Sequence, residues 1–100
     1  MHFGEKIREL RESQGLLQRQ LAANLEIDTP MFSKIERGER KAKREQVLQL
    51  AELLETDVNE LLTIWLADKV FDIVKDEATA EGALKVAEST LKYSKPSKHV

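Results

Sequence analysis

The sequence predicts an all-α fold, and three observations support this fold class. Apolar residues recur with helical spacing along most of the 100-residue chain, as expected for amphipathic helices. The chain has only 4 glycines and 2 prolines, a low content that favours helices over a turn-rich β fold. Residues suited to helix capping, Asp28, Asp57 and Thr79, stand between the periodic stretches, so several separate helices are expected.

The first half of the chain is predicted to form helices over residues 3–14, 18–25, 29–37 and 44–54. Gly15 and Gly38 follow the first and third of these helices, where glycine commonly ends a helix. Asp28 is placed to cap the third helix, and the first turn of that helix tolerates Pro30. The fourth helix has a clear amphipathic stripe, formed by Val47, Leu50, Ala51 and Leu54.

The next predicted helix differs because its apolar residues cover more than one face. It follows Asp57 and can run from Val58 to about Glu77 without a glycine or a proline. A last amphipathic helix follows Thr79, with an apolar stripe of Ala80, Ala83, Leu84, Ala87 and Leu91. Residues 92–100 are polar and are expected to form a flexible basic tail.

The composition argues against several classes of protein. The chain has no cysteine, which excludes a disulfide framework, a thiolate zinc site and a cysteine nucleophile. It has no glycine-rich phosphate loop or nucleophile signature, so neither an enzyme nor a cofactor is expected. His2 and His99 stand near opposite ends of the chain, and no metal site is expected from them. No signal peptide or membrane span is recognisable, so a cytoplasmic protein is expected.

Charge is distributed unevenly along the chain. The net charge is −2, yet residues 34–44 carry 6 basic and 2 acidic side chains. Residues 55–91 carry 3 basic and 9 acidic side chains. A local basic patch on an otherwise acidic protein can bind a phosphate backbone. The alternative is that residues 34–44 form a solvated charged loop.

Residues 18–37 have the pattern of two short helices joined by a tight turn. In a helix-turn-helix the two helices cross steeply, so that the second helix can enter the major groove of DNA. Ala22 and Ala23 are candidates for the small residue at the crossing, and Ile27 can fill the core at the turn. The inner side of the second helix is apolar, at Phe32 and Ile35. Its outer side presents Thr29, Pro30, Met31, Ser33, Lys34 and Arg37.

At these residues the chain resembles the phage-repressor-like (Cro/C1-type, XRE) helix-turn-helix family. The resemblance is carried by Gly15-Leu16-Leu17-Gln18, Leu21-Ala22 and Ile35-Glu36-Arg37-Gly38. The last two helices of that family are resembled by Leu50-Ala51-Glu52-Leu53-Leu54 and Val58-Asn59-Glu60-Leu61-Leu62. The match implies a five-helix lambda-repressor-like helix-turn-helix domain over residues 1–64. A C-terminal helical extension over residues 65–91 and the tail over residues 92–100 would follow.

The resemblance also implies roles for individual residues. Gln18 corresponds to a family residue that touches phosphate, and Arg11 and Glu36 match a pair that forms a partly buried salt bridge. The outer side of the second helix would read bases, and the loop after it would contact phosphates. The expected DNA-contacting residues are Gln18, Thr29, Pro30, Met31, Ser33, Lys34, Arg37, Arg40, Lys41, Lys43 and Arg44. The chain departs from the family at Leu17, where a capping Ser or Thr is typical, and at Pro30, where a polar residue is common.

The expected function is a sequence-specific transcription regulator, a repressor, that binds a palindromic operator in double-stranded DNA as a homodimer. Restriction–modification controller proteins have a similar fold and size. One alternative is the antitoxin of a toxin–antitoxin pair, which would hold a protein partner through its C-terminal helices. Another is a structural adaptor that has kept the fold and lost DNA binding, although the basic loop argues against it.

The homodimer interface is expected within residues 58–91, because an exposed apolar patch of this size is unusual for a soluble monomer. The expected interface residues are Ile64, Trp65, Leu66, Val70, Phe71, Ile73 and Val74. Two-fold pairing there would place two recognition helices about one DNA turn apart, roughly 34 Å. The alternative is that the last helix folds back and covers the patch within one chain.

Overall fold

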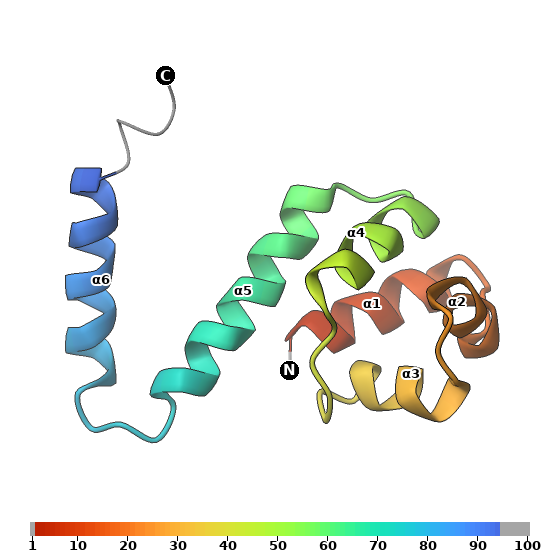
Figure 1. The fold of residues 1–100 in the computed structure, drawn as a ribbon, viewed down its shortest axis with the longest axis horizontal. Helices are drawn as coiled ribbons and strands as arrows, with labels where there is room; N and C mark the ends of the chain where they lie inside the picture. Colours follow the sequence, from red (N-terminus) through yellow and green to blue (C-terminus); the bar gives the residue numbers. More distant parts are fainter. Residues whose placement is uncertain (1, 95–100) are drawn as a thin grey trace. The chain divides into compact units, whose positions relative to one another are not determined.

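The structure, a computed structural model, describes residues 2–94. These residues form six α-helices and no β-strand, which confirms the predicted all-α fold (Figure 1). The helices are α1 (His2–Ser13), α2 (Gln18–Leu25), α3 (Thr29–Glu36), α4 (Arg44–Leu53), α5 (Val58–Val74) and α6 (Ala80–Ser94). None of these described helices is both long enough and apolar enough to cross a membrane.

The chain divides into two compact units, residues 1–69 and residues 70–100, and the boundary falls inside α5. The first unit thus extends a few residues beyond the domain expected from the sequence. Trp65 and Asp68 account for this extension, because both side chains are buried. Asp68 accepts a hydrogen bond from the backbone N–H of Phe3 (2.9 Å), which ties α5 to the start of α1.

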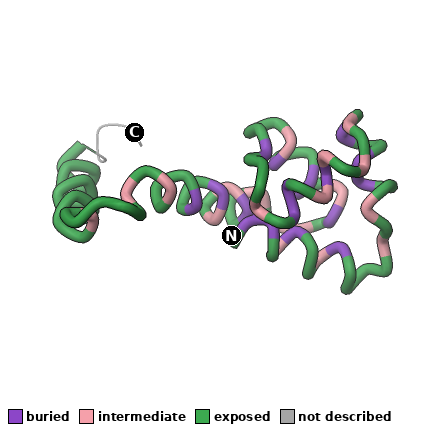
Figure 2. The backbone as a smooth tube through the Cα atoms, turned by 90° about the horizontal axis from the view of Figure 1, so that it is seen from below, coloured by how far each residue is buried: buried purple, intermediate pink, exposed green. Residues whose placement is uncertain are grey.

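One hydrophobic core holds the first unit together. It contains side chains from α1 to α5 and from the loop before α4. Its largest fully buried side chains are Phe32, Ile7, Leu50, Leu54, Leu61 and Val47. Figure 2 shows the buried positions spread over the helices of this unit. Full burial of such a side chain contributes about 1.5–3 kcal/mol to folding, so this core holds α1 to α5 in place relative to one another.

The backbones of α1 and α3 approach each other closely at Gly4. A Cβ atom added to Gly4 would lie 2.3 Å from the carbonyl oxygen of Glu36 and 2.5 Å from that of Ile35. These neighbours are backbone atoms, so they cannot rotate away from a larger side chain. Glycine is therefore required at this contact, which seats the end of α3 against the start of α1.

The second and third helices form the helix-turn-helix that the sequence predicts. α2 packs against both α3 and α4. Ala22 is buried, whereas Ala23, the other candidate for the helix crossing, is exposed. Glu26 turns the chain with a φ of 59°, and Ile27 is half-buried against the core as expected.

Glutamine side chains compensate for missing caps at α2 and α4. At α2 the backbone N–H of Leu17 donates to Oε1 of Gln20 at 2.7 Å. At α4 the backbone N–H of Lys43 donates to Oε1 of Gln46 at 2.8 Å. In each helix, the glutamine supplies its half of a capping box. The second helix therefore begins where the sequence predicts, although Leu17 cannot cap it.

The second unit has helices but no core among its described residues. None of residues 70–94 is buried, and α6 has no buried side chain over its 15 residues. Figure 2 shows α6 as exposed along nearly all of its length. The helical pattern of the sequence is realised here without the burial that normally stabilises an amphipathic helix.

The ends of the last two helices differ from the sequence prediction. α5 ends at Val74, short of the predicted end near Glu77, and α6 continues to Ser94. Residues 92–94, predicted to begin the flexible tail, are therefore helical. Residues 95–100, which hold the rest of that tail and His99, lie outside the described residues.

Candidate nucleic-acid interface

The start of α3 carries the residues that are expected to read DNA. Asp28 caps this helix as predicted, because its Oδ1 accepts a hydrogen bond from the backbone N–H of Met31 at 2.8 Å. Pro30 lies in the first turn, where a missing N–H group costs no helical hydrogen bond. Among the expected DNA-contacting residues on the outer side of α3, the exposed ones are Pro30, Lys34 and Arg37, and the half-buried ones are Thr29, Met31 and Ser33.

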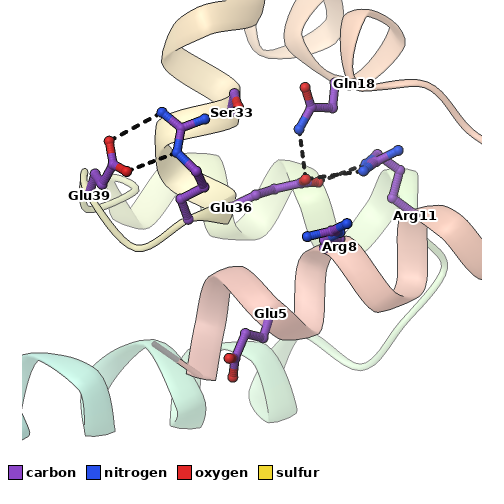
Figure 3. Close-up of a pocket in the computed structure, with 8 residues that line it drawn as sticks. Glu5, Arg8, Arg11, Gln18, Ser33, Glu36 and Glu39 are labelled. Carbon is purple, nitrogen blue, oxygen red and sulfur yellow. Dashed lines mark hydrogen bonds and ion pairs between the residues drawn. The ribbon is translucent and has the colours of Figure 1, made fainter.

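A buried ion pair fixes the end of α3 against α1. Nε and Nη2 of Arg11 donate to the two carboxylate oxygens of Glu36 at 2.7 and 3.1 Å (Figure 3). The third nitrogen, Nη1, donates to the carbonyl oxygen of Leu16 at 2.9 Å. The hydrogen bond to Glu36 raises the pKa of Arg11 above its ordinary value, although burial acts in the opposite direction. The salt bridge implied by the family resemblance is thus present, and all three side-chain nitrogens of Arg11 donate to acceptors within the protein.

Gln18 joins this cluster from the start of α2. Its side-chain Nε2 donates to Oε1 of Glu36 at 2.8 Å. One carboxylate therefore connects α1, α2 and α3, as Figure 3 shows. A primary amide has two N–H groups, so this bond leaves one of them for another acceptor. The side chain expected to touch phosphate is thus oriented before DNA arrives.

A second polar cluster ties α3 to the turn that follows it, and the sequence did not indicate it. Nε and Nη2 of Arg37 donate to the two carboxylate oxygens of Glu39 at 2.8 and 3.2 Å, and Nη1 donates to Oγ of Ser33. This pairing raises the pKa of Arg37 and lowers the pKa of Glu39. Both side chains are exposed, so solvent and salt screen the interaction. In the free protein Arg37 is thus paired with an acid, and Ser33 is bonded to Arg37.

The two clusters line one open hollow of about 580 Å³ formed by α1, α2, α3 and the turn after α3. Its lining side chains are Glu5, Arg8, Arg11, Gln18, Ser33, Glu36, Arg37 and Glu39 (Figure 3). Three carboxylates face three guanidinium groups there, so the hollow has no strong excess of either charge. Its charged and polar side chains can form hydrogen bonds with a polar surface placed against the hollow. Among residues 2–94 no cluster of His, Cys, Asp or Glu side chains is arranged to hold a metal ion.

The basic segment, residues 40–44, contains the expected phosphate contacts. Its exposed cationic side chains are Arg40, Lys41, Lys43 and Arg44. Ala42 lies in the middle of the segment and is buried in the core. Its carbonyl oxygen accepts a hydrogen bond from the indole N–H of Trp65 at 2.8 Å. The segment therefore presents its charges outward while its backbone is held from within.

The expectation that Trp65 belongs to a dimer interface is wrong. Its side chain is only 5% exposed, because its ring packs in the core and its N–H group bonds to Ala42. Ile64 is also half-buried against this core. The remaining residues of the expected interface are Leu66, Val70, Phe71 and Ile73, which are exposed, and Val74, which is half-buried.

Comparisons with known proteins agree with this geometry. The helix-turn-helix domain family matches residues 2–63. The restriction-modification controller protein C.AhdI from Aeromonas hydrophila shares 37% sequence identity, covering 60% of this chain and 87% of that chain, with a TM-score of 0.55. The clp gene regulator ClgR from Corynebacterium glutamicum shares 20% identity, covering 94% of this chain and 90% of that chain, with a TM-score of 0.57. This second likeness concerns the fold alone.

No curated protein sequence matches the chain significantly. The chain belongs to the helix-turn-helix domain family and is a DNA-binding transcription regulator of that class.

Proposed function

We propose that the protein is a repressor that binds a palindromic operator as a homodimer, in the manner of a restriction–modification controller. The observation that carries this proposal is a capped recognition helix, α3, followed closely by the exposed cations of residues 40–44. Such a helix can enter the major groove while the cations contact the flanking phosphates. The 37% identity to C.AhdI, which is a controller protein, supports the same regulatory role.

Lys34 is the side chain of α3 best suited to read a base edge. It is exposed, whereas its chain neighbour Ile35 is buried in the core. A lysine can donate to the acceptors of guanine in the major groove, and a good contact of this kind gives about 1–3 kcal/mol of discrimination. Thr29 and Met31 can add apolar contacts to thymine methyl groups.

The homodimer is proposed from the apolar surface of residues 70–94. Val70, Phe71 and Ile73 are 43%, 54% and 75% exposed. α6 adds exposed apolar side chains at Leu84, Val86, Leu91 and Tyr93. A second copy would bury this surface and supply the core that the unit lacks. The exposure of these residues does not favour the alternative in which the last helix covers the patch within one chain.

Selection of bound DNA from a random pool tests the function class and the symmetry together. We expect a palindromic consensus, since a two-fold dimer reads two equal half-sites. In a parallel selection, Lys34→Ala should lose preference at one base pair of each half-site. An asymmetric consensus would contradict the proposed symmetry, and an unaltered preference in the variant would show that Lys34 does not read bases.

Sedimentation tests the proposed interface. We expect a dimeric wild type at micromolar concentration and a folded, monomeric Phe71→Asp, Val74→Asp double variant. Leu48→Asp is the control, because it places an aspartate on an exposed apolar residue of the first unit, outside the proposed interface. A double variant that remains dimeric would place the interface elsewhere. A monomeric wild type that binds the product of a neighbouring gene on co-expression would favour an antitoxin instead.

A further inference from the structure

We infer that Trp65 is a positioning residue for DNA binding, which holds the basic segment in the place where its cations meet phosphate. This inference rests on the proposed binding of double-stranded DNA and goes beyond it. Sequence alone assigns the phosphate contacts to residues 40–44. The structure adds that their placement depends on a side chain of α5, about twenty residues further along the chain.

The indole–carbonyl hydrogen bond is the first support for this role. Residues 41–43 have no regular secondary structure, so helical hydrogen bonds do not fix their backbone. Ala42 is 3% exposed, and a buried carbonyl group requires a partner inside the protein. Nε1 of Trp65 donates to this carbonyl oxygen at 2.8 Å. Ala42 stands between Lys41 and Lys43, which are both expected to contact phosphate.

The face of the indole ring provides the second support. The guanidinium carbon of Arg44 lies 5.7 Å from the ring centroid, and Nζ of Lys69 lies 3.9 Å from it. Cations at such distances are attracted by the negative face of an aromatic ring. Arg44 is itself an expected phosphate contact, so the same ring restrains a side chain as well as the backbone of the basic segment.

A role limited to core packing would predict a different result for Phe at this position. Phenylalanine keeps an aromatic ring that fills most of the same space, but it has no N–H group to donate. In Trp65→Phe the Ala42 carbonyl loses its partner while the apolar contacts largely remain. The hydrogen bond can therefore be tested separately from the packing.

The experiment measures DNA affinity against salt concentration for the wild type, Trp65→Phe and Leu61→Val. Leu61 is fully buried one turn earlier on α5, so Leu61→Val is a matched core change that leaves the indole bond in place. Loss of one phosphate contact changes the slope of log K against log salt by about 0.9, which corresponds to about fifteenfold in affinity at 50 mM salt if the affinities converge at 1 M salt. We expect at least this change in Trp65→Phe, equal for operator and unrelated DNA, and a wild-type slope in Leu61→Val.

The outcomes separate this inference from the proposed function. If the folded Trp65→Phe protein keeps the wild-type slope and affinity, the inference is wrong while DNA binding stands. If Leu61→Val flattens the slope as much as Trp65→Phe, the effect is general destabilisation and the inference is again overturned. A wild type that does not bind DNA contradicts the proposed function and removes the basis of this inference.

A second measurement on the unaltered protein decides the matter if Trp65→Phe does not fold. The chain has a single tryptophan, so its indole N–H gives one identifiable proton resonance in an NMR spectrum. We expect this proton to exchange slowly with solvent and its resonance to shift on titration with unrelated double-stranded DNA, at the same midpoint as the amides of residues 40–44. A resonance that stays fixed while those amides shift would overturn the inference.

Discussion

The two units of this protein follow the same helical sequence rules and end with different amounts of burial. Residues 2–69 contain the whole hydrophobic core, whereas none of residues 70–94 is buried. Yet α6 has an amphipathic pattern much like those of the shorter helices in the first unit. The difference teaches that periodicity specifies a helix and its apolar face, while burial depends on what lies against that face. Isolated helices of this length are marginally stable in water, which is why a partner surface is proposed for the second unit.

The largest expected effect contrasts a buried ion pair with an exposed one. Glu36→Gln leaves the buried charge of Arg11 without its carboxylate, which costs about 3–5 kcal/mol of the free energy of unfolding. In the second unit, Lys75 and Asp72 lie 4.0 Å apart with both side chains partly exposed. Lys75→Ala should therefore cost less than about 1 kcal/mol. Urea denaturation measures both values, and equal losses would contradict the contrast in burial.

A matched pair of isoleucines tests apolar burial directly. Ile7 is fully buried, whereas Ile73 is 75% exposed. Ile7→Ala should lower the free energy of unfolding by about 2–5 kcal/mol at every protein concentration. Ile73→Ala should change the monomer by no more than about 0.5 kcal/mol. In the proposed dimer, the effect of Ile73→Ala should appear as a changed dissociation constant in sedimentation. A large loss for Ile73→Ala under monomeric conditions would show that its own chain covers the site.

Two helical glycines sharpen the same comparison with a smaller effect. At Gly4 a Cβ atom would meet backbone oxygens, whereas at Gly82 it would meet nothing within 4 Å. Gly4→Ala should lower the free energy of unfolding by about 1–3 kcal/mol or more, because α1 and α3 must separate. Gly82→Ala should stabilise the helical state of α6 by about 0.5–1 kcal/mol, because alanine has the higher helix propensity. The helix content of α6 should rise as a result. Thermal unfolding followed by circular dichroism measures both, and a stabilising Gly4→Ala would refute the close backbone contact.

The smallest expected effect concerns the exposed pair of Arg37 and Glu39. Glu39→Gln should release Arg37 and strengthen binding to all DNA alike, with a salt slope steeper by up to about one unit. Glu45→Gln is the control, since it removes the same charge near the basic segment without releasing Arg37. Equal gains in the two variants would show that net charge alone acts.

The pH dependence of this pair follows from the direction of the shift. The pKa of Glu39 is lowered from 4.5 by its hydrogen bond to Arg37. The pair is therefore complete above the ordinary carboxylate range and is lost only as pH falls through the lowered value. We expect the ratio of Glu39→Gln to wild-type affinity to stay constant between about pH 6 and pH 8. A ratio that varies across this range would assign the effect to another group.

Local signals predicted most of the fold. The second helix begins at Gln18 and ends at Leu25 as predicted, and the Asp28 cap on the next helix is present. These features depend on residues only a few positions apart. The pairing of Arg37 with Glu39 was missed because two residues this close do not share a helix face. Their contact requires the turn at Gly38, where φ is +77°.

The sequence by itself determined the helices, the turn of the helix-turn-helix and the family, since capping, glycine stops and periodicity act within a few residues. Only the tertiary structure decided which apolar faces are covered. The periodicity of α5 could not say that Trp65 faces Ala42 while Ile73 faces solvent. Nor could the apolar pattern of α1 show that Gly4 meets the backbone of α3. These choices depend on which elements meet in space, and a helix with apolar residues on several sides permits more than one arrangement.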